Sequence, residues 1–92
     1  MTSAGIQAII TGVVQMVGYR WFAVNAAKNL KLTGWVKNLD DGSVEIKAFG
    51  DRGALNDFIK QLNIGPMSCK VSDVRVREIE YELTYTDFMV EN

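Results

Sequence analysis

The sequence predicts an α+β fold in which two helices cover one face of an antiparallel β-sheet. Short segments rich in β-branched residues, typical of strands, are interspersed with two segments whose apolar residues recur at helical spacing. The two helical segments have the same apolar spacing, so each is expected to bury one face against the sheet. An Asp-Gly pair lies between two strand segments, and this dipeptide is typical of a hairpin turn.

The elements follow one another in a recognisable order. Strands are expected at residues 6–13, 35–38, 44–49, 71–81 and 86–90, and helices at residues 22–30 and 54–62. Asp51 is suited to cap the second helix, and a bulge is expected near Arg77, where the apolar residues change phase. This order is that of a ferredoxin-like βαββαβ sandwich with a short extra C-terminal strand. Residues 1–92 are expected to form one domain, with residues 1–5 as a flexible N-terminal tail.

Composition narrows the class of protein. Hydrophobic residues make up 48% of the 92 residues and charged residues 23%, which is typical of a globular domain. The net charge of -1, from 10 basic and 11 acidic side chains, disfavours nucleic-acid binding. No apolar run approaches the ~20 residues needed to cross a bilayer, and the N-terminus lacks the features of a signal peptide. A cytoplasmic protein without membrane contact is therefore expected.

The sequence contains no histidine and one cysteine, Cys69. Without histidine, Ser-His and Cys-His nucleophile pairs, phosphohistidine chemistry and nearly all zinc sites are excluded. A single cysteine excludes a disulfide within the chain, and Cys69 is interpreted as a small apolar packing residue. An enzyme with this sequence would therefore work without an imidazole.

The predicted topology brings two polar features to one edge of the sheet. The first and second strands flank the third and run the same way, so the loop at residues 15–20 is expected near Asn38. Backbone N–H groups in such a loop can bind an anion, and Arg20 at the helix start adds a guanidinium for phosphate. The Asn38 amide can hold and orient a water. A tight turn with a surface arginine, and an asparagine chosen for its turn conformation, remain the alternatives.

Two long motifs carry a family resemblance. The first has the form G-x-V-Q-G-V-x-[FY]-R, and it is matched at all but one position by Gly12–Arg20. The second has the form G-[FYW]-V-x-N-x-x-x-G-x-V, five further residues, then G, and it is matched throughout by Gly34–Asn38 with Gly42, Val44 and Gly50. The chain closely resembles the acylphosphatases, small enzymes with a ferredoxin-like fold that hydrolyse the carboxyl-phosphate bond of acyl phosphates.

The resemblance implies a role for each matching residue. Arg20 takes the place of the phosphate-binding arginine, and Asn38 that of the asparagine that positions the attacking water. The loop whose amides cradle the phosphate corresponds to Gln15, Met16, Val17, Gly18, Tyr19 and Arg20. The implied reaction is in-line attack of water on phosphorus, with the substrate phosphate taking the proton. No metal, cofactor or nucleic acid is implied; the substrate is a small acyl phosphate, inorganic phosphate is a product, and a monomer suffices.

Three other functions remain as alternatives. The first is a non-catalytic anion-binding or regulatory module on the same fold. The second is an RNA-binding domain, which needs paired exposed aromatic residues on the central strands, where the third strand offers only Phe49. The third is a fragment of a larger carbamoyl-transfer maturation protein that opens with a similar domain.

The two tryptophans are interpreted as packing residues. Trp35 lies in the second motif and is expected in the core or on a sheet face. Trp21 directly follows Arg20 and could wall the pocket, although partial burial on the helix is the favoured interpretation.

Met16 departs from the family pattern, because it stands where the motif has glycine. A side chain there can crowd the anion, or strain the loop by roughly 1–2 kcal/mol if a positive φ is required. We therefore expect reduced but detectable activity, and we expect Met16→Gly to raise kcat/KM for an acyl phosphate. Steady-state kinetics of the two chains tests this, and an unchanged kcat/KM would exclude crowding by the side chain.

Overall fold

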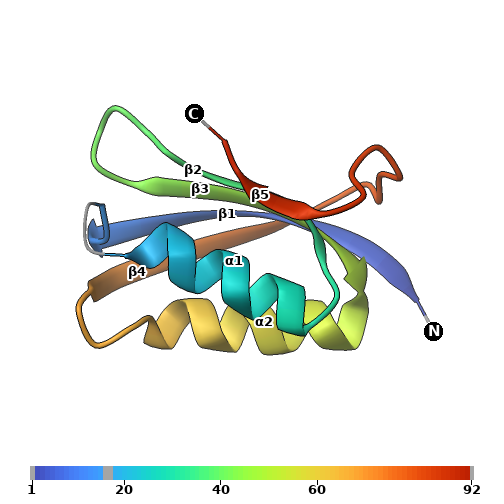
Figure 1. Ribbon diagram of the computed structural model, residues 1–92, viewed down its shortest axis with the longest axis horizontal. Coiled ribbons are helices and arrows are strands. Elements are labelled where there is room, and N and C mark those ends of the chain that lie inside the picture. Colours follow the sequence, from blue (N-terminus) through green and yellow to red (C-terminus); the bar gives the residue numbers. More distant parts are fainter. Residues whose placement is uncertain (1, 16–17, 92) are drawn as a thin grey trace.

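The computed structural model describes residues 2–15 and 18–91 and has the predicted order of elements (Figure 1). The elements are β1 (Ser3–Val13), α1 (Tyr19–Asn29), β2 (Thr33–Asn38), β3 (Val44–Asp51), α2 (Arg52–Ile64), β4 (Lys70–Ile79) and β5 (Phe88–Val90). Residues 3–5 were expected in a flexible tail, but they pair with β3 as the start of β1. No helix in the described part of the chain is long and apolar enough to cross a membrane.

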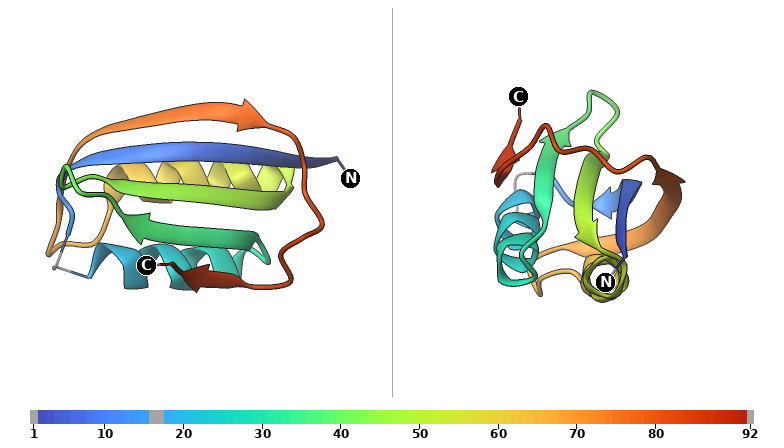
Figure 2. Two further views of the ribbon diagram at one scale, coloured as in Figure 1. Left: turned by 90° about the horizontal axis from the view of Figure 1, so that it is seen from above. Right: turned by 90° about the vertical axis from the view of Figure 1, so that its right-hand side faces the viewer.

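The five strands form one mixed sheet in the order β4-β1-β3-β2-β5. β1 pairs antiparallel with β3 and β4, and β2 pairs antiparallel with β3, as predicted. The short extra strand β5, for which the sequence indicated no direction, pairs parallel with β2. The reason is the connection after β4: residues 80–87 cross the sheet before β5 begins (Figure 2), and β5 then runs in the direction of β2.

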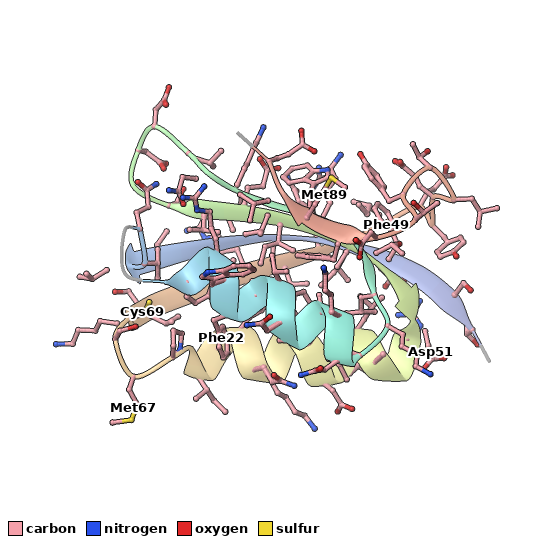
Figure 3. The ribbon with its side chains drawn as sticks, viewed as in Figure 1. Phe22, Phe49, Asp51, Met67, Cys69 and Met89 are labelled. Atoms are coloured by element: carbon pink, nitrogen blue, oxygen red, sulfur yellow. The ribbon has the colours of Figure 1, made fainter. Side chains whose placement is uncertain are left out.

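Both helices pack on the same face of the sheet, and the core lies between these two layers (Figure 1). Alternate residues of the central strands point into this core, among them Ile6, Ala8, Ile10, Val44, Ile46 and Ala48. Asp51 caps α2 as predicted, since its carboxylate accepts a hydrogen bond from the Ala54 N–H at 3.3 Å. Figure 3 shows Asp51 at the start of α2 and Phe22 between the two helices.

The β1–β4 ladder contains a bulge, but not where the sequence indicated. Thr11 pairs with Asp73 and Gly12 with Val71, so Ser72 is the extra residue, whereas the register is regular at Arg77. Gly12 has a φ of 130°, and a Cβ there would lie 2.1 Å from the Lys70 carbonyl oxygen. The apolar phase change that suggested Arg77 instead reflects Ile79, which pairs with Gly5 on the face of the sheet away from the helices.

The helix-free face of the sheet carries an aromatic cluster that is packed within the chain. The Tyr85 ring stacks on Phe49 with centroids 5.7 Å apart, and Tyr81 meets Phe49 edge-on. Trp35 is 8% exposed and donates from Nε1 to the Tyr85 hydroxyl at 3.2 Å, so the predicted packing role of Trp35 is confirmed. Because Phe49 is buried, the central strands lack the exposed aromatic pair that RNA stacking requires.

Phe88 joins β5 to the core. Its side chain is 1% exposed and packs edge-on against Phe58 of α2, with ring centroids 5.9 Å apart. We expect Phe88→Ala to lower the free energy of unfolding by about 3–5 kcal/mol, because it removes a buried ring and leaves a cavity.

The neighbouring Met89 provides a matched control, since its side chain is 51% exposed. Met89→Ala is expected to change the free energy of unfolding by no more than about 0.5 kcal/mol. Denaturant unfolding measures both variants. A chain truncated before Phe88 that melts at the full-length temperature would contradict this role for β5.

Candidate active site

The loop after β1 and the hairpin after β2 meet at one edge of the sheet, as the topology predicted (Figure 2). The contact is made by Gln15, whose side-chain Nε2 donates to the Leu39 carbonyl at 2.7 Å and the Ser43 carbonyl at 2.8 Å. Leu39 directly follows Asn38, so this contact places the predicted anion loop beside the predicted water-binding residue. Met16 and Val17, which belong to the same predicted loop, lie outside the described residues.

The start of α1 has the features of an anion site. Gly18 is the N-cap in a left-handed conformation, with φ 90° and ψ 8°, and it supplies no side chain to the helix end. The first intrahelical bond runs from Phe22 N–H to the Gly18 carbonyl, so the N–H groups of Tyr19, Arg20 and Trp21 have no acceptor inside the helix. The first turn contains no acidic residue. The helix dipole therefore leaves a positive end without a countercharge.

Arg20 lies at this helix start and lines a cavity of about 240 Å³. Its side chain is half-buried, and no carboxylate of residues 2–15 and 18–91 forms an ion pair with it. The guanidinium thus keeps its full charge for a ligand, in a fork that matches two phosphate oxygens. The described lining of the cavity consists of Val14, Gly18, Tyr19, Arg20, Trp21 and Val90.

Tyr19, predicted as part of the anion loop, has a structural side chain. It is 1% exposed, and its hydroxyl donates to the Leu62 carbonyl near the end of α2 at 2.7 Å. Burial raises the pKa of this phenol well above its usual range. The Tyr19 ring therefore fixes the start of α1 against α2, while its backbone N–H is one of those at the open helix end.

Asn38 ends β2 and points to the helix-covered side of the sheet, the side of Val36. Asn38 lies within the strand rather than in the turn, and its φ is not positive. Its side-chain Oδ1 is buried and has no hydrogen-bond donor among the described residues. A buried amide oxygen without a donor is costly and points to a role beyond folding. Asn38 itself is not among the described residues that line the cavity.

Two cavity residues were missed or misjudged from the sequence. Trp21 is 69% exposed and lines the cavity, so the interpretation as a partly buried residue is wrong and the wall interpretation is confirmed. Val90 reaches the same cavity from β5, far along the chain from Arg20. Its place depends on the parallel pairing of β5 with β2, which no local pattern indicates.

No three His, Cys, Asp or Glu side chains of residues 2–15 and 18–91 are grouped as metal ligands. The cavity instead combines a guanidinium that has no ion pair among the described residues with the open end of a helix. On a βαββαβ sandwich, this arrangement defines a small domain with a site suited to a phosphate-like anion.

Comparison with known proteins identifies the family. The acylphosphatase family model matches residues 6–90. An acylphosphatase of Chlorobaculum tepidum is 39% identical over 90 residues, covering 98% of both chains. The crystal structure of the Bacillus subtilis acylphosphatase superposes with a TM-score of 0.93 at 38% identity, covering 97% of this chain and 99% of that one. The chain belongs to the acylphosphatase family.

The activity follows from this membership: the chain hydrolyses acyl phosphates, and inorganic phosphate is a product. These matches support the enzyme over the non-catalytic module. A similar domain also occurs in a much longer protein. Full-length HypF, in a phosphate- and nucleotide-bound form, matches with a TM-score of 0.86 and 28% identity, covering 99% of this chain but 12% of that chain.

Proposed function

We propose that the chain, acting as a single domain, hydrolyses acyl phosphates by direct attack of water, with Arg20 and Asn38 as the catalytic residues. The observation that carries this proposal is the guanidinium of Arg20, which lies in the cavity at the start of α1 and has no ion pair with any described residue. The phosphoryl group binds there, between that guanidinium and the N–H groups of the first helical turn. Charge that develops on the phosphoryl oxygens in the transition state then meets fixed positive partners.

The nucleophile is a water held by Asn38. The buried Oδ1 accepts a hydrogen bond from that water, which supplies the donor that this oxygen lacks among the described residues. The water oxygen forms a bond to phosphorus while the bond to the acyl oxygen breaks. The carboxylate leaves with that electron pair, and the water proton passes to a phosphoryl oxygen. Because a carboxylate is a good leaving group, alignment and charge stabilisation suffice without a histidine base.

The same proposal includes the loop and the conditions of the reaction. Residues 15–20 form the phosphate-binding loop, in which Met16 stands at the position of the motif glycine. The reaction needs no metal or cofactor, and the protein works as a cytoplasmic monomer. Sedimentation of the purified chain tests its oligomeric state.

The apolar side of the cavity receives the acyl group. Val14, Trp21 and Val90 face the same space as Arg20, so a ligand with its phosphate on Arg20 has apolar walls beside it. The volume of about 240 Å³ lies below the ~300–1,000 Å³ typical of drug-sized ligands, which fits a small acyl phosphate. We therefore propose that compact apolar or aromatic acyl groups are preferred.

Benzoyl phosphate hydrolysis with a chelator present tests the roles of Arg20 and Asn38. Arg20→Ala and Asn38→Ala are each expected to lower kcat by about 10²–10³-fold, since each removes a partner of the transition state. Arg75 provides the control for Arg20, because it is an exposed arginine on β4, paired with Asp73. Arg75→Ala should keep the parent rate. A folded Arg20→Ala or Asn38→Ala chain with the parent kcat would refute the assigned role.

A comparison of benzoyl with acetyl phosphate tests the acyl side of the site. Trp21→Ala is expected to lower kcat/KM for benzoyl phosphate by about tenfold through loss of an aromatic contact. The value for acetyl phosphate should change by less than about twofold, because its methyl group reaches little of the wall. Leu83→Ala is the control, since Leu83 is 82% exposed outside the cavity lining. An equal loss for both substrates would show that Trp21 does not distinguish acyl groups.

A further inference from the structure

The side chain of Gln15 is committed to the hairpin. Its Nε2 donates to two carbonyls, those of Leu39 at 2.7 Å and Ser43 at 2.8 Å. A primary amide nitrogen carries two hydrogens, so both are engaged in these two bonds. The Gln15 side-chain amide therefore has no hydrogen left to donate to a phosphate, although Gln15 lies within the predicted phosphate loop.

The two acceptors are the carbonyls that close the hairpin. The Ser43 carbonyl also accepts from Leu39 N–H at 2.8 Å, and the Leu39 carbonyl from Gly42 N–H at 3.2 Å. Asp41 fixes the turn further, since its Oδ1 accepts from Ser43 N–H at 2.9 Å and Ser43 Oγ at 2.5 Å. These hydrogen bonds to Ser43 lower the pKa of the Asp41 carboxyl. Gln15 thus holds a turn that is already well defined.

We propose that Gln15 is a positioning residue that sets the separation between the phosphate loop and Asn38. The inference rests on the proposed function, in which Arg20 holds the phosphoryl group and Asn38 holds the water. Gln15 lies shortly before the helix start that carries Arg20, and its acceptor Leu39 adjoins Asn38. Arg20 and Asn38 belong to different elements, α1 and β2. The side chain of Gln15 links the loop that precedes α1 to the hairpin that follows β2. In-line attack is sensitive to such placement, since a displacement of about 1 Å can cost about 10²-fold in rate.

The test replaces the amide without emptying its space. Gln15→Met keeps the length of the side chain and removes both donors. We expect kcat for benzoyl phosphate to fall by between about tenfold and a hundredfold. The KM and the inhibition constant of inorganic phosphate should change by less than about twofold, because Arg20 and the helix N–H groups are retained.

Gln7 provides a matched control on the same strand. Its side chain is also half-buried and hydrogen-bonded, donating to Glu45 at 2.6 Å and accepting from Arg77, but it lies on the helix-free face. Gln7→Met removes a comparable pair of hydrogen bonds and is expected to keep the parent kcat. A stability effect alone would lower the melting temperature of both variants, and the assay is run well below either transition.

The outcomes separate this inference from the proposed function. A Gln15→Met chain with the parent kcat would overturn the positioning role while leaving Arg20 and Asn38 in place. A matching rise in KM and in the phosphate inhibition constant would also overturn it, because Gln15 would then act in binding. If Arg20→Ala and Asn38→Ala keep the parent rate, the proposed function fails first, and the positioning role fails with it. Loss of kcat in Gln15→Met alone, with phosphate inhibition retained, would support it.

Discussion

The antiparallel pairing of β3 with both β1 and β2 is the constraint on which the rest of the structure depends. Because β3 runs against both neighbours, β1 and β2 run the same way, and their C-terminal ends reach the same edge of the sheet. Right-handed crossovers then place α1 and α2 on one face, with the start of α1 beside the end of β2 (Figure 2). A loop and a hairpin from separate parts of the sequence are thereby brought within hydrogen-bonding distance. The site is a direct consequence of strand order.

The chemistry available at this edge is electrostatic rather than acid–base. With no histidine in the chain, no imidazole provides a base near neutral pH. The Arg20 guanidinium carries a positive charge, and the open N–H groups of α1 carry partial positive charges. Such fixed partners suit a reaction with a good leaving group, where stabilising the phosphoryl charges and aligning the water lower the barrier. A poorer leaving group would need a general acid to protonate it.

Features with a local cause and features that follow from strand order were predictable from the sequence, whereas contacts of single residues with distant partners were not. The Asp51 cap and the Asp-Gly hairpin depend on a few adjacent residues, and both were predicted correctly. The meeting of residue 15 with the hairpin after Asn38 followed from topology alone. The bulge was predicted near Arg77 but lies at Ser72. Its position depends on Gly12 of the paired strand, whose backbone approaches Lys70 too closely for a side chain.

The same distinction explains the site. The motif Gly12–Arg20 indicated the position of the candidate anion site, but not which partners its side chains have. Tyr19 points into the core and reaches Leu62, whereas Gln15 reaches the hairpin, so neither partner is close in sequence. The exposure of Trp21 depends on what packs beside α1. Val90 lies in the cavity because its strand, β5, forms the edge of the sheet next to β2. The motif specifies the residue types, but the role of each side chain depends on its partners elsewhere in the fold.

The described side chains at both ends of residues 15–20 have different roles in the structure. Tyr19 joins α1 to α2, and Gln15 joins the loop to the hairpin. Arg20, next to Tyr19, has no ionic partner among the described residues. An arginine in an untethered loop would lose conformational entropy when it binds phosphate, and that loss would weaken binding. Because the neighbours of Arg20 are anchored in the folded protein, this conformational entropy is lost during folding rather than during binding, and burial of the core offsets the loss. The fold therefore anchors the chain on both sides of Arg20, at Gln15 and at Tyr19. The proposed effect of Gln15 on the rate follows from this anchoring.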